Sequence, residues 1–288
     1  MKVLVVGSSG LIGSTMFRVL SRGAGLEVQG TIRDPAVKRY FTAADADQLL
    51  ISGDLESQDN LVDLFRQARP AVVVNCAGVT KHLPGADDPL RVLPMNALLP
   101  HRLARLCEVA GARLVHVSTD CVFAGTKGGY REEDLADAID VYGRSKCLGE
   151  VVSPAAVTLR TSTIGHELQS SYGLLEWFLK QEGQCKGFAG AIFSGLPTVI
   201  FAQVVRDLVI ARTDLSGLYH VAGAPIAKYD LLRLIAEQYG KDIVIEKDTG
   251  VQIDRSLNAD RFAGATGFSP ATWPEMIRVM HADSLERM

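Results

Sequence analysis

Tyr142 and Lys146 are the residues whose types and spacing point most directly to chemistry. They lie four residues apart in a segment that reads as helical and ends at Pro154, so the phenol and the ammonium share one face. A free phenol, with a pKa of about 10, is a slow acid, and a neighbouring cation lowers that pKa. The pair could therefore protonate the alkoxide that forms when hydride adds to a ketone.

A second candidate is Ser118-Thr119-Asp120, which follows the fifth strand that we predict below. Open α/β sheets bind ligands at the carboxyl ends of their strands, where a hydroxyl can donate to the same ketone oxygen. The simpler interpretation is that Tyr-x-x-x-Lys and Ser-Thr both occur by chance in many helices and strand ends. Their order, together with a glycine turn at the N-terminus, argues against coincidence.

The glycine turn directly follows the first predicted strand and opens a helix; it reads Gly7-Ser8-Ser9-Gly10-Leu11-Ile12-Gly13. Such spacing lets backbone approach a pyrophosphate and aims free helix N–H groups at that anion. We predict that the cofactor contacts Gly7, Ser9, Gly10, Leu11 and Ile12. Glycine-rich turns also occur in α/β proteins that bind nothing, so the turn alone is a weak signal.

Arg33 lies twenty residues after Gly13, at the end of the second predicted strand, where NAD-binding proteins usually carry an acidic residue. A guanidinium there suits the 2′-phosphate of NADP. A solvated surface arginine is the alternative, and the adjacent Asp34 could still reach a ribose hydroxyl. We therefore expect NADP(H) as the preferred cofactor and keep NAD(H) as the second choice.

Two further strand ends are predicted to border the adenine and the ribose, although each could be a plain turn. Their residues are Asp54 and Leu55 after the third strand, and Cys76, Ala77 and Gly78 after the fourth.

Alternating β-branched runs and helical patterns predict an α/β fold with a doubly wound parallel sheet. The predicted strands are 2–6, 27–32, 49–52, 71–75, 113–117 and 157–161, and an amphipathic helix is predicted over 96–110.

After residue 161 the pattern loosens around Gly183, Gly187, Gly190 and Gly195, which we interpret as glycine-rich loops. A short helix is predicted near 174–181. Further helices are expected over 201–211, 228–239 and 274–281, and a strand over 217–221. We expect an NADP-binding domain over 1–162, rejoined by about 198–223, and a smaller substrate lobe formed by 163–197 and 224–288.

Composition excludes several other classes of protein. The 288 residues are 47% hydrophobic and 22% charged with a net charge of −3, which suggests neither a nucleic-acid nor an anionic-membrane partner. No apolar run is long enough for a signal peptide or a membrane span, so we expect a cytoplasmic protein. The five cysteines are widely spaced and are expected to be reduced, and the scattered histidines predict no dedicated metal site.

The combined motifs resemble the extended short-chain dehydrogenases/reductases and, within them, the dTDP-4-dehydrorhamnose reductase family. The resemblance rests on the glycine turn, on Tyr142 to Lys146 with Gly149-Glu150, and on Ser118-Thr119-Asp120-Cys121-Val122-Phe123. It extends over most of the chain, because later segments also sit where that family has comparable residues. These are Glu133-Asp134, Leu159-Arg160, Gly195-Leu196-Pro197-Thr198 and Ser256-Leu257-Asn258.

This resemblance implies that Thr119 polarises the ketone, Tyr142 donates the proton, and Lys146 tunes the tyrosine and holds the nicotinamide ribose. It implies reduction of the 4-keto group of a nucleotide-activated 6-deoxysugar, in the synthesis of cell-surface polysaccharide precursors, and it allows a homodimer. Predicted substrate-binding residues are Asp120, Cys121, Phe123, Arg160 and Arg255; the two arginines could bind a diphosphate bidentately.

Two departures from the family pattern lie near the expected sugar pocket. Cys121 stands where the family usually has tyrosine, and Ala138 stands where a proline often precedes the catalytic tyrosine by four residues. Cys121 also leaves a dehydratase without its second carboxylate. A nucleotide-sugar epimerase on the same scaffold remains an alternative, as does a non-catalytic NADP-binding regulatory subunit.

Overall fold

A computed structural model describes residues 1–81, 83 and 85–286. The chain forms two compact units. The first comprises Met1–Ser118, Ile139–Leu159 and Ala202–Leu218, and the second comprises Thr119–Ala138, Arg160–Phe201 and the chain from Tyr219 onward. Residues 119–138, which the sequence pattern assigned to the first domain, therefore cluster with the second unit.

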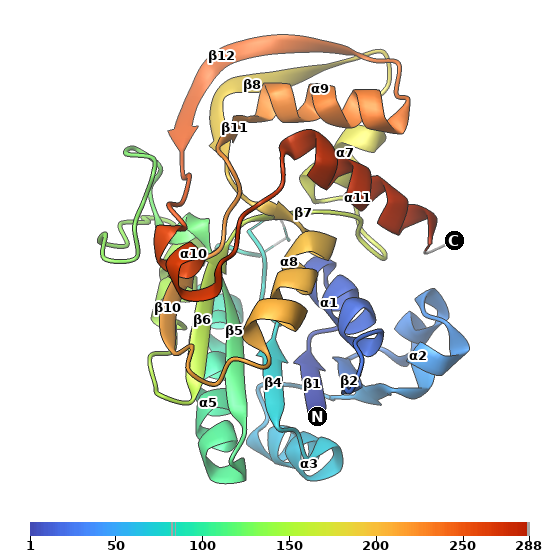
Figure 1. The fold of residues 1–288 in the computed structure, drawn as a ribbon, viewed down its shortest axis with the longest axis vertical. Helices are drawn as coiled ribbons and strands as arrows, with labels where there is room; N and C mark the ends of the chain where they lie inside the picture. The colour runs from blue at the N-terminus through green and yellow to red at the C-terminus, as the bar shows by residue number, and fades with distance from the viewer. Residues whose placement is uncertain (82, 84, 287–288) are drawn as a thin grey trace. The chain divides into compact units, whose positions relative to one another are not determined.

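Seven strands form the central sheet, in the order β10-β6-β5-β4-β1-β2-β3 (Figure 1). They are β1 (Lys2–Val6), β2 (Glu27–Ile32), β3 (Leu49–Ile51), β4 (Val72–Asn75), β5 (Arg113–Thr119), β6 (Ala156–Thr161) and β10 (Gly217–His220). The pairs β1–β2, β1–β4, β2–β3 and β4–β5 are parallel. Strand order runs outward from β1 in both directions, which confirms the predicted doubly wound sheet.

Burial on both faces explains why the central strands are continuously apolar. Leu4 and Val6 of β1 lie in a buried cluster with α3 (Gln58–Ala68) and α5 (Leu99–Ala110). Helix α1 (Leu11–Ser21) packs on β1 and β2. Because side chains alternate along a strand, the residue of β1 between Leu4 and Val6 points to the opposite face of the sheet.

The predicted helix over 96–110 forms, and its first residues belong to a π-helical turn. A π-helical turn at Pro94–Leu98 joins α4 (Pro89–Leu93) to α5, and α5 ends at Gly111, whose φ of 65° is left-handed. The remaining helical elements of the first unit are short. They are η1 (Pro35–Tyr40), α2 (Ala43–Asp47), α6 (Val141–Leu148) and η4 (Val205–Val209), which continues α8 (Thr198–Val204).

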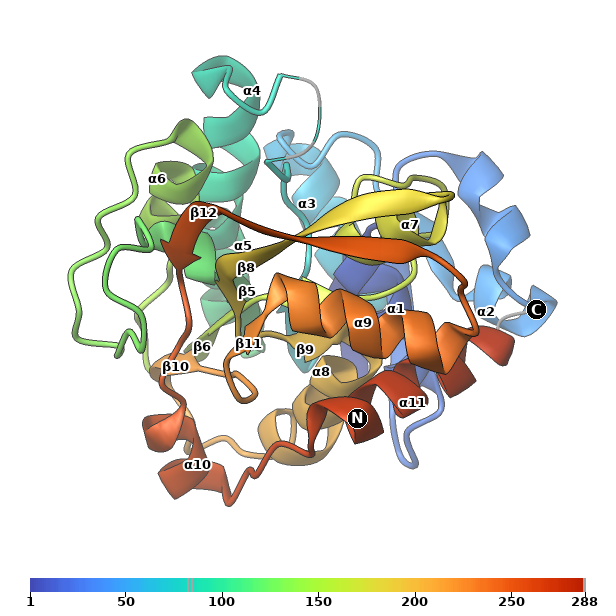
Figure 2. The same ribbon diagram turned by 90° about the horizontal axis from the view of Figure 1, so that it is seen from above.

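The second unit contains a three-stranded sheet in which β8 (Gln184–Phe193) pairs in parallel with β12 (Val244–Asp254) and antiparallel with β11 (Ile226–Ala227). Helix α9 (Lys228–Tyr239) lies along the long β8–β12 pair in both views (Figures 1 and 2). The other elements are η3 (Asp120–Val122), β7 (Thr163–Ile164), α7 (Leu174–Leu179), β9 (Leu196–Pro197), α10 (Asp260–Thr266) and α11 (Trp273–Leu285).

Strand β8 corrects the sequence prediction of glycine-rich loops between 183 and 195. The chain is extended through Gly187 and Gly190. At both positions another element packs so closely that a side chain would not fit. A Cβ on Gly187 would lie 3.0 Å from the Cα of Tyr229 in α9, and one on Gly190 would overlap the carbonyl oxygen of Val251 in β12. Glycine here marks packing within a strand rather than a loop.

Candidate functional site

The glycine turn after β1 is closed by backbone packing. Gly7 has a φ of 88°, and a Cβ there would lie 2.8 Å from the Cα of Ala77. A Cβ on Gly13 would overlap the carbonyl oxygen of Gly7. The turn, the first residues of α1 and the segment after β4 therefore meet at backbone distance, which only glycine permits.

The amino end of α1 has the donors that a pyrophosphate requires. Its N-cap residue is Gly10, which contributes no side-chain cap, and its first turn contains no acidic residue. Helices leave their first N–H groups without intrahelical partners, and an anion can satisfy them. Ser9 and Gly10 are exposed, whereas Leu11 and Ile12 are half-buried. These residues fit the diphosphate of a dinucleotide.

Arg33 is exposed directly after β2, as the sequence placed it. The neighbouring carboxylate of Asp34 accepts the N–H of Ala36 at 2.9 Å and caps η1. Asp54 behaves similarly: three residues past β3, its carboxylate accepts the N–H of Glu56 at 2.9 Å. Both predicted acidic contacts thus also shape their own turns, and Leu55 is half-buried beside the second.

Asn96 fixes the chain that follows β4. Its fully buried amide accepts the N–H of Val79 at 2.8 Å and donates to the carbonyl of Val79 at 2.9 Å and to Ser145 Oγ at 3.2 Å. A Cβ on Gly78 would lie 2.9 Å from the Asn96 amide oxygen, so glycine is needed at this predicted cofactor position. The amide therefore links the segment after β4 to helix α6.

Helix α6 carries the predicted proton donor and its cation. Asp140 caps the helix by accepting the N–H of Gly143 at 2.8 Å. Tyr142 is half-buried, and Lys146 is 7% exposed with its Nζ donating to the carbonyl of Val117 at 2.8 Å. Burial lowers the pKa of Lys146 to about 8, against the opposing effect of Glu150. The Lys146 side chain is therefore protonated in most molecules at neutral pH.

The groups around Lys146 are mainly neutral. Burial raises the pKa of the Cys76 thiol to about 12, so this thiol stays protonated. His116 is completely buried, and burial together with Lys146 holds its pKa well below the ordinary value. The Asn75 amide contacts His116 Nδ1 at 3.1 Å. Neither Cys76 nor His116 adds a charge that would compete with the lysine cation.

In the second unit, Thr119 begins the predicted substrate segment and is 8% exposed. Its hydroxyl donates to Asp120 Oδ1 at 3.1 Å and accepts the N–H of Cys121 at 3.1 Å, which caps η3. The bond to Asp120 is long for an O–H donor, so the hydroxyl can turn toward a ketone at modest cost. Arg255 lies beside this segment, 3.8 Å from Cys121 Sγ.

Phe123 is the centre of a stacked cluster that includes both predicted arginines. Its ring stacks on Tyr130 with centroids 4.1 Å apart, and the Arg160 guanidinium lies 5.0 Å from its centroid. Arg160 is 4% exposed and contacts His220 Nε2 at 3.3 Å, whereas Arg255 Nε donates to the carbonyl of Phe123 at 2.7 Å. A ring that is 0% exposed leaves no surface for a ligand in this conformation.

Each unit thus gathers part of the predicted set. In the first, Ala77 touches Gly7 and Cys76 interacts with Lys146, so the segment after β4 connects the glycine turn with the lysine. In the second, Cys121, Phe123, Arg160 and Arg255 form one cluster. The sequence prediction missed Asn96 and Glu150. For Asn96, the signal in the sequence was a polar residue inside an apolar helix. For Glu150, it was the Gly-Glu pair that follows the lysine.

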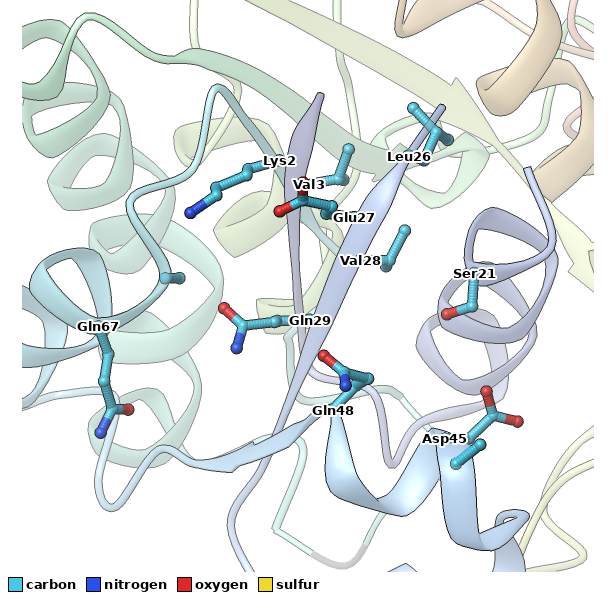
Figure 3. A pocket seen from close by; sticks show the side chains of 12 residues that line it. Lys2, Val3, Ser21, Leu26, Glu27, Val28, Gln29, Asp45, Gln48 and Gln67 are labelled. Atoms are coloured by element: carbon cyan, nitrogen blue, oxygen red, sulfur yellow. The ribbon is translucent and has the colours of Figure 1, made fainter. Parts of the chain in front are cut away.

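A pocket of about 490 Å³ lies at the opposite end of the strands from the glycine turn (Figure 3). Lys2 and Glu27, which line it, are the first residues of β1 and β2. Because doubly wound sheets bind their ligands at the carboxyl ends of the strands, this pocket is not the expected cofactor site.

No helix in the described ranges is long and apolar enough to cross a bilayer. Within the same ranges, no three His, Cys, Asp or Glu side chains gather as metal ligands would.

Comparison with known proteins identifies relatives along the whole chain. A dTDP-4-dehydrorhamnose reductase of Aggregatibacter actinomycetemcomitans is 23% identical and is matched over 98% of both chains. A probable low-salt glycan biosynthesis reductase of Haloferax volcanii is 27% identical, again over 98% of both.

Solved structures have the same fold. A hypothetical dTDP-4-dehydrorhamnose reductase from Sulfolobus tokodaii matches with a TM-score of 0.77 and 26% identity, covering 95% of this chain and 98% of that one. A dTDP-4-dehydrorhamnose reductase from Bacillus anthracis, solved in complex with NADP, matches with a TM-score of 0.80 and 18% identity, covering 99% and 100%. The family model of the RmlD substrate binding domain matches residues 1–266, and the chain belongs to this family.

Proposed function

We propose that this protein uses NADPH to reduce the 4-keto group of a nucleotide-activated 6-deoxysugar. The reaction would serve the synthesis of polysaccharide precursors, with the cytoplasm as its site. The names of the curated relatives support the substrate class, since they include dTDP-4-dehydrorhamnose reductases and a spore coat polysaccharide biosynthesis protein from Bacillus subtilis.

One observation carries the proposal. The segment after β4 approaches the glycine turn at Ala77 and, at Cys76, lies near enough to Lys146 to influence its pKa. A buried lysine that remains cationic at neutral pH is thereby tied to the backbone turn that fits a pyrophosphate. Burying an ammonium costs free energy. Stability alone therefore does not explain a buried lysine near a turn that fits a pyrophosphate.

The roles of the side chains follow from their chemistry. NADPH, which the glycine turn and Arg33 would hold, would provide the hydride that reduces the carbonyl carbon. Tyr142 donates its phenolic proton to the oxygen that becomes negative, and the Lys146 ammonium stabilises the resulting phenolate. Thr119 donates a hydrogen bond to the same oxygen and orients it before transfer. Arg33 is assigned to the 2′-phosphate, which favours NADPH over NADH.

For the nucleotide diphosphate we favour Arg255 over Arg160. Arg255 is partly exposed and borders Cys121, whereas Arg160 is almost completely buried against Phe123. Phe123 and Arg160 would then act by holding the loop that carries Thr119. A homodimer remains an expectation from the family resemblance, and sedimentation of the purified protein tests it.

The test is NADPH oxidation against a panel of dTDP-, UDP- and GDP-linked 4-keto-6-deoxysugars, with product configuration determined by NMR. Stoichiometric consumption of NADPH supports the reductase. Cofactor that copurifies and shows no net turnover with any sugar would instead favour an epimerase.

Tyr142→Phe separates the reductase from a regulatory subunit. We expect kcat to fall by about 10²- to 10⁴-fold while the Kd for NADPH changes little, because the variant loses only the proton donor. Equal turnover by Tyr142→Phe and the wild type would refute the catalytic assignment.

A further inference from the structure

Glu150 lies in the segment between helix α6 and strand β6, and its side chain contacts strand β5. The helix ends at Leu148, and Gly149 caps it with a backbone N–H bonded to the last turn. A Cβ on Gly149 would overlap the carbonyl oxygen of Asn96, so glycine lets the chain pass close to the π-helical turn. The next residue, Glu150, accepts the hydroxyl proton of Ser118 at 2.7 Å.

This contact has the length of a charge-assisted hydrogen bond, which is stronger than one between neutral groups. Ser118 is 3% exposed, and its single hydroxyl proton is directed to the carboxylate. One residue earlier in β5, the carbonyl of Val117 accepts from Lys146. Two consecutive residues of the strand are therefore bound by two residues of the α6 segment that are four positions apart.

We propose that Glu150 is a positioning residue for the proposed reaction. Its carboxylate holds the end of β5 through Ser118 and keeps the buried Lys146 side chain in its cationic form. It acts through the lysine and does not itself touch the substrate. The kinetic consequences rest on the proposed function, whereas the effect on Lys146 does not.

The charges facing Lys146 support this role. Within the described residues, the groups that interact electrostatically with the lysine include Cys76 after β4, His116 on β5 and Glu150, and Tyr142 lies one helical turn before it on α6. The Cys76 thiol and the His116 ring are neutral at physiological pH, since burial raises the pKa of the former and lowers that of the latter.

Of the groups acting on Lys146 in the described part of the chain, Glu150 is therefore the anion that offsets the cost of burying the ammonium. Its effect is to raise the pKa of the lysine, opposite to the effect of burial. Without it, the lysine would lose its proton at lower pH, and a smaller fraction of the protein would carry the cation that stabilises a phenolate at neutral pH.

Three variants separate the charge from the hydrogen bond. Glu150→Gln keeps an acceptor for Ser118 and removes the charge. Glu150→Asp keeps the charge and shortens the side chain. Ser118→Ala removes the hydrogen bond and keeps the charge. Glu108→Gln, at an exposed ion pair with Arg105 on α5, is the matched control for loss of one surface carboxylate.

The first measurement is a pH titration of Lys146 by side-chain ¹⁵N NMR of the full protein, with the resonance assigned by its loss in Lys146→Met. We expect Glu150→Gln to titrate about one pH unit lower than the wild type. Glu150→Asp, Ser118→Ala and Glu108→Gln should stay near the wild type. A wild-type titration in Glu150→Gln, or an equal downward movement in Ser118→Ala, would overturn the proposal.

The second measurement is the pH profile of kcat/KM for the sugar that the panel identifies. The alkaline limb of Glu150→Gln should move with the lysine, which gives about a fivefold loss at pH 8 and less than about a twofold loss at pH 6. A loss of equal size at every pH would show structural damage and would contradict the role assigned to the charge. If no sugar is reduced, the reductase assignment fails while the NMR titration still decides the role of Glu150.

Discussion

Replacing Lys146 by Met should change how the stability of the protein depends on pH. The folded protein lowers the pKa of Lys146 from its ordinary 10.5 to about 8, mainly through burial. The unfolded chain keeps the lysine protonated up to about pH 10.5. Between these two values the unfolded state binds more protons than the folded state, so this lysine makes stability rise with pH.

The magnitude follows from the two pKa values. At about 1.4 kcal/mol per pKa unit, the ammonium opposes folding by about 3 kcal/mol at pH 7. At pH 9.5 the remaining opposition is about 1 kcal/mol, because the folded state has already released the proton. The free energy of unfolding of the wild type, relative to Lys146→Met, should therefore increase by about 2 kcal/mol from pH 7 to pH 9.5.

Urea denaturation of the cofactor-free protein at several pH values measures this difference. Subtracting the variant from the wild type at each pH cancels the titration of the other groups. Lys186→Met, at a lysine whose side chain is 68% exposed, gives the baseline for losing a surface cation. Parallel curves for wild type and Lys146→Met would refute the reasoning, as would a wild type that loses stability relative to the variant as pH rises.

Two further predictions concern the cofactor. Gly13→Ala should abolish NADPH binding in calorimetry, since its Cβ would overlap the Gly7 carbonyl oxygen. The control is Gly264→Ala, where a Cβ meets nothing within 4 Å. Wild-type affinity for NADPH in Gly13→Ala would contradict the tight turn. Arg33→Ala should weaken NADPH by about tenfold and NADH by less than about twofold, because only NADPH carries the 2′-phosphate. Equal losses for both cofactors would remove Arg33 from the phosphate site.

Local patterns were sufficient to predict the framework. The first six strands were predicted within two residues of their observed bounds, because each is a short apolar run between turn residues. The glycine turn was predicted for the same reason: it depends on backbone geometry that side chains forbid. Tyr142 and Lys146 were assigned to one helix face because a four-residue spacing has the same meaning in any α-helix.

Contacts between distant segments could not be predicted in this way. Nothing near Asn96 in the sequence indicates that its amide would bind Val79 and Ser145. The pattern around Gly187 and Gly190 predicts a loop. The structure shows a strand there, and its glycines are explained by the close packing of α9 and β12. Such positions depend on which backbone lies nearby, and the pattern of a single segment does not contain that information.

The sequence by itself therefore determined which groups are available: a phenol, an ammonium one helical turn later, and a glycine-rich turn. Only the tertiary structure decided their state. Folding buries Lys146, which lowers its pKa, and brings the carboxylate of Glu150 to act in the opposite direction. A pKa depends on desolvation and on neighbours brought together by folding, so no reading of spacing alone could supply it.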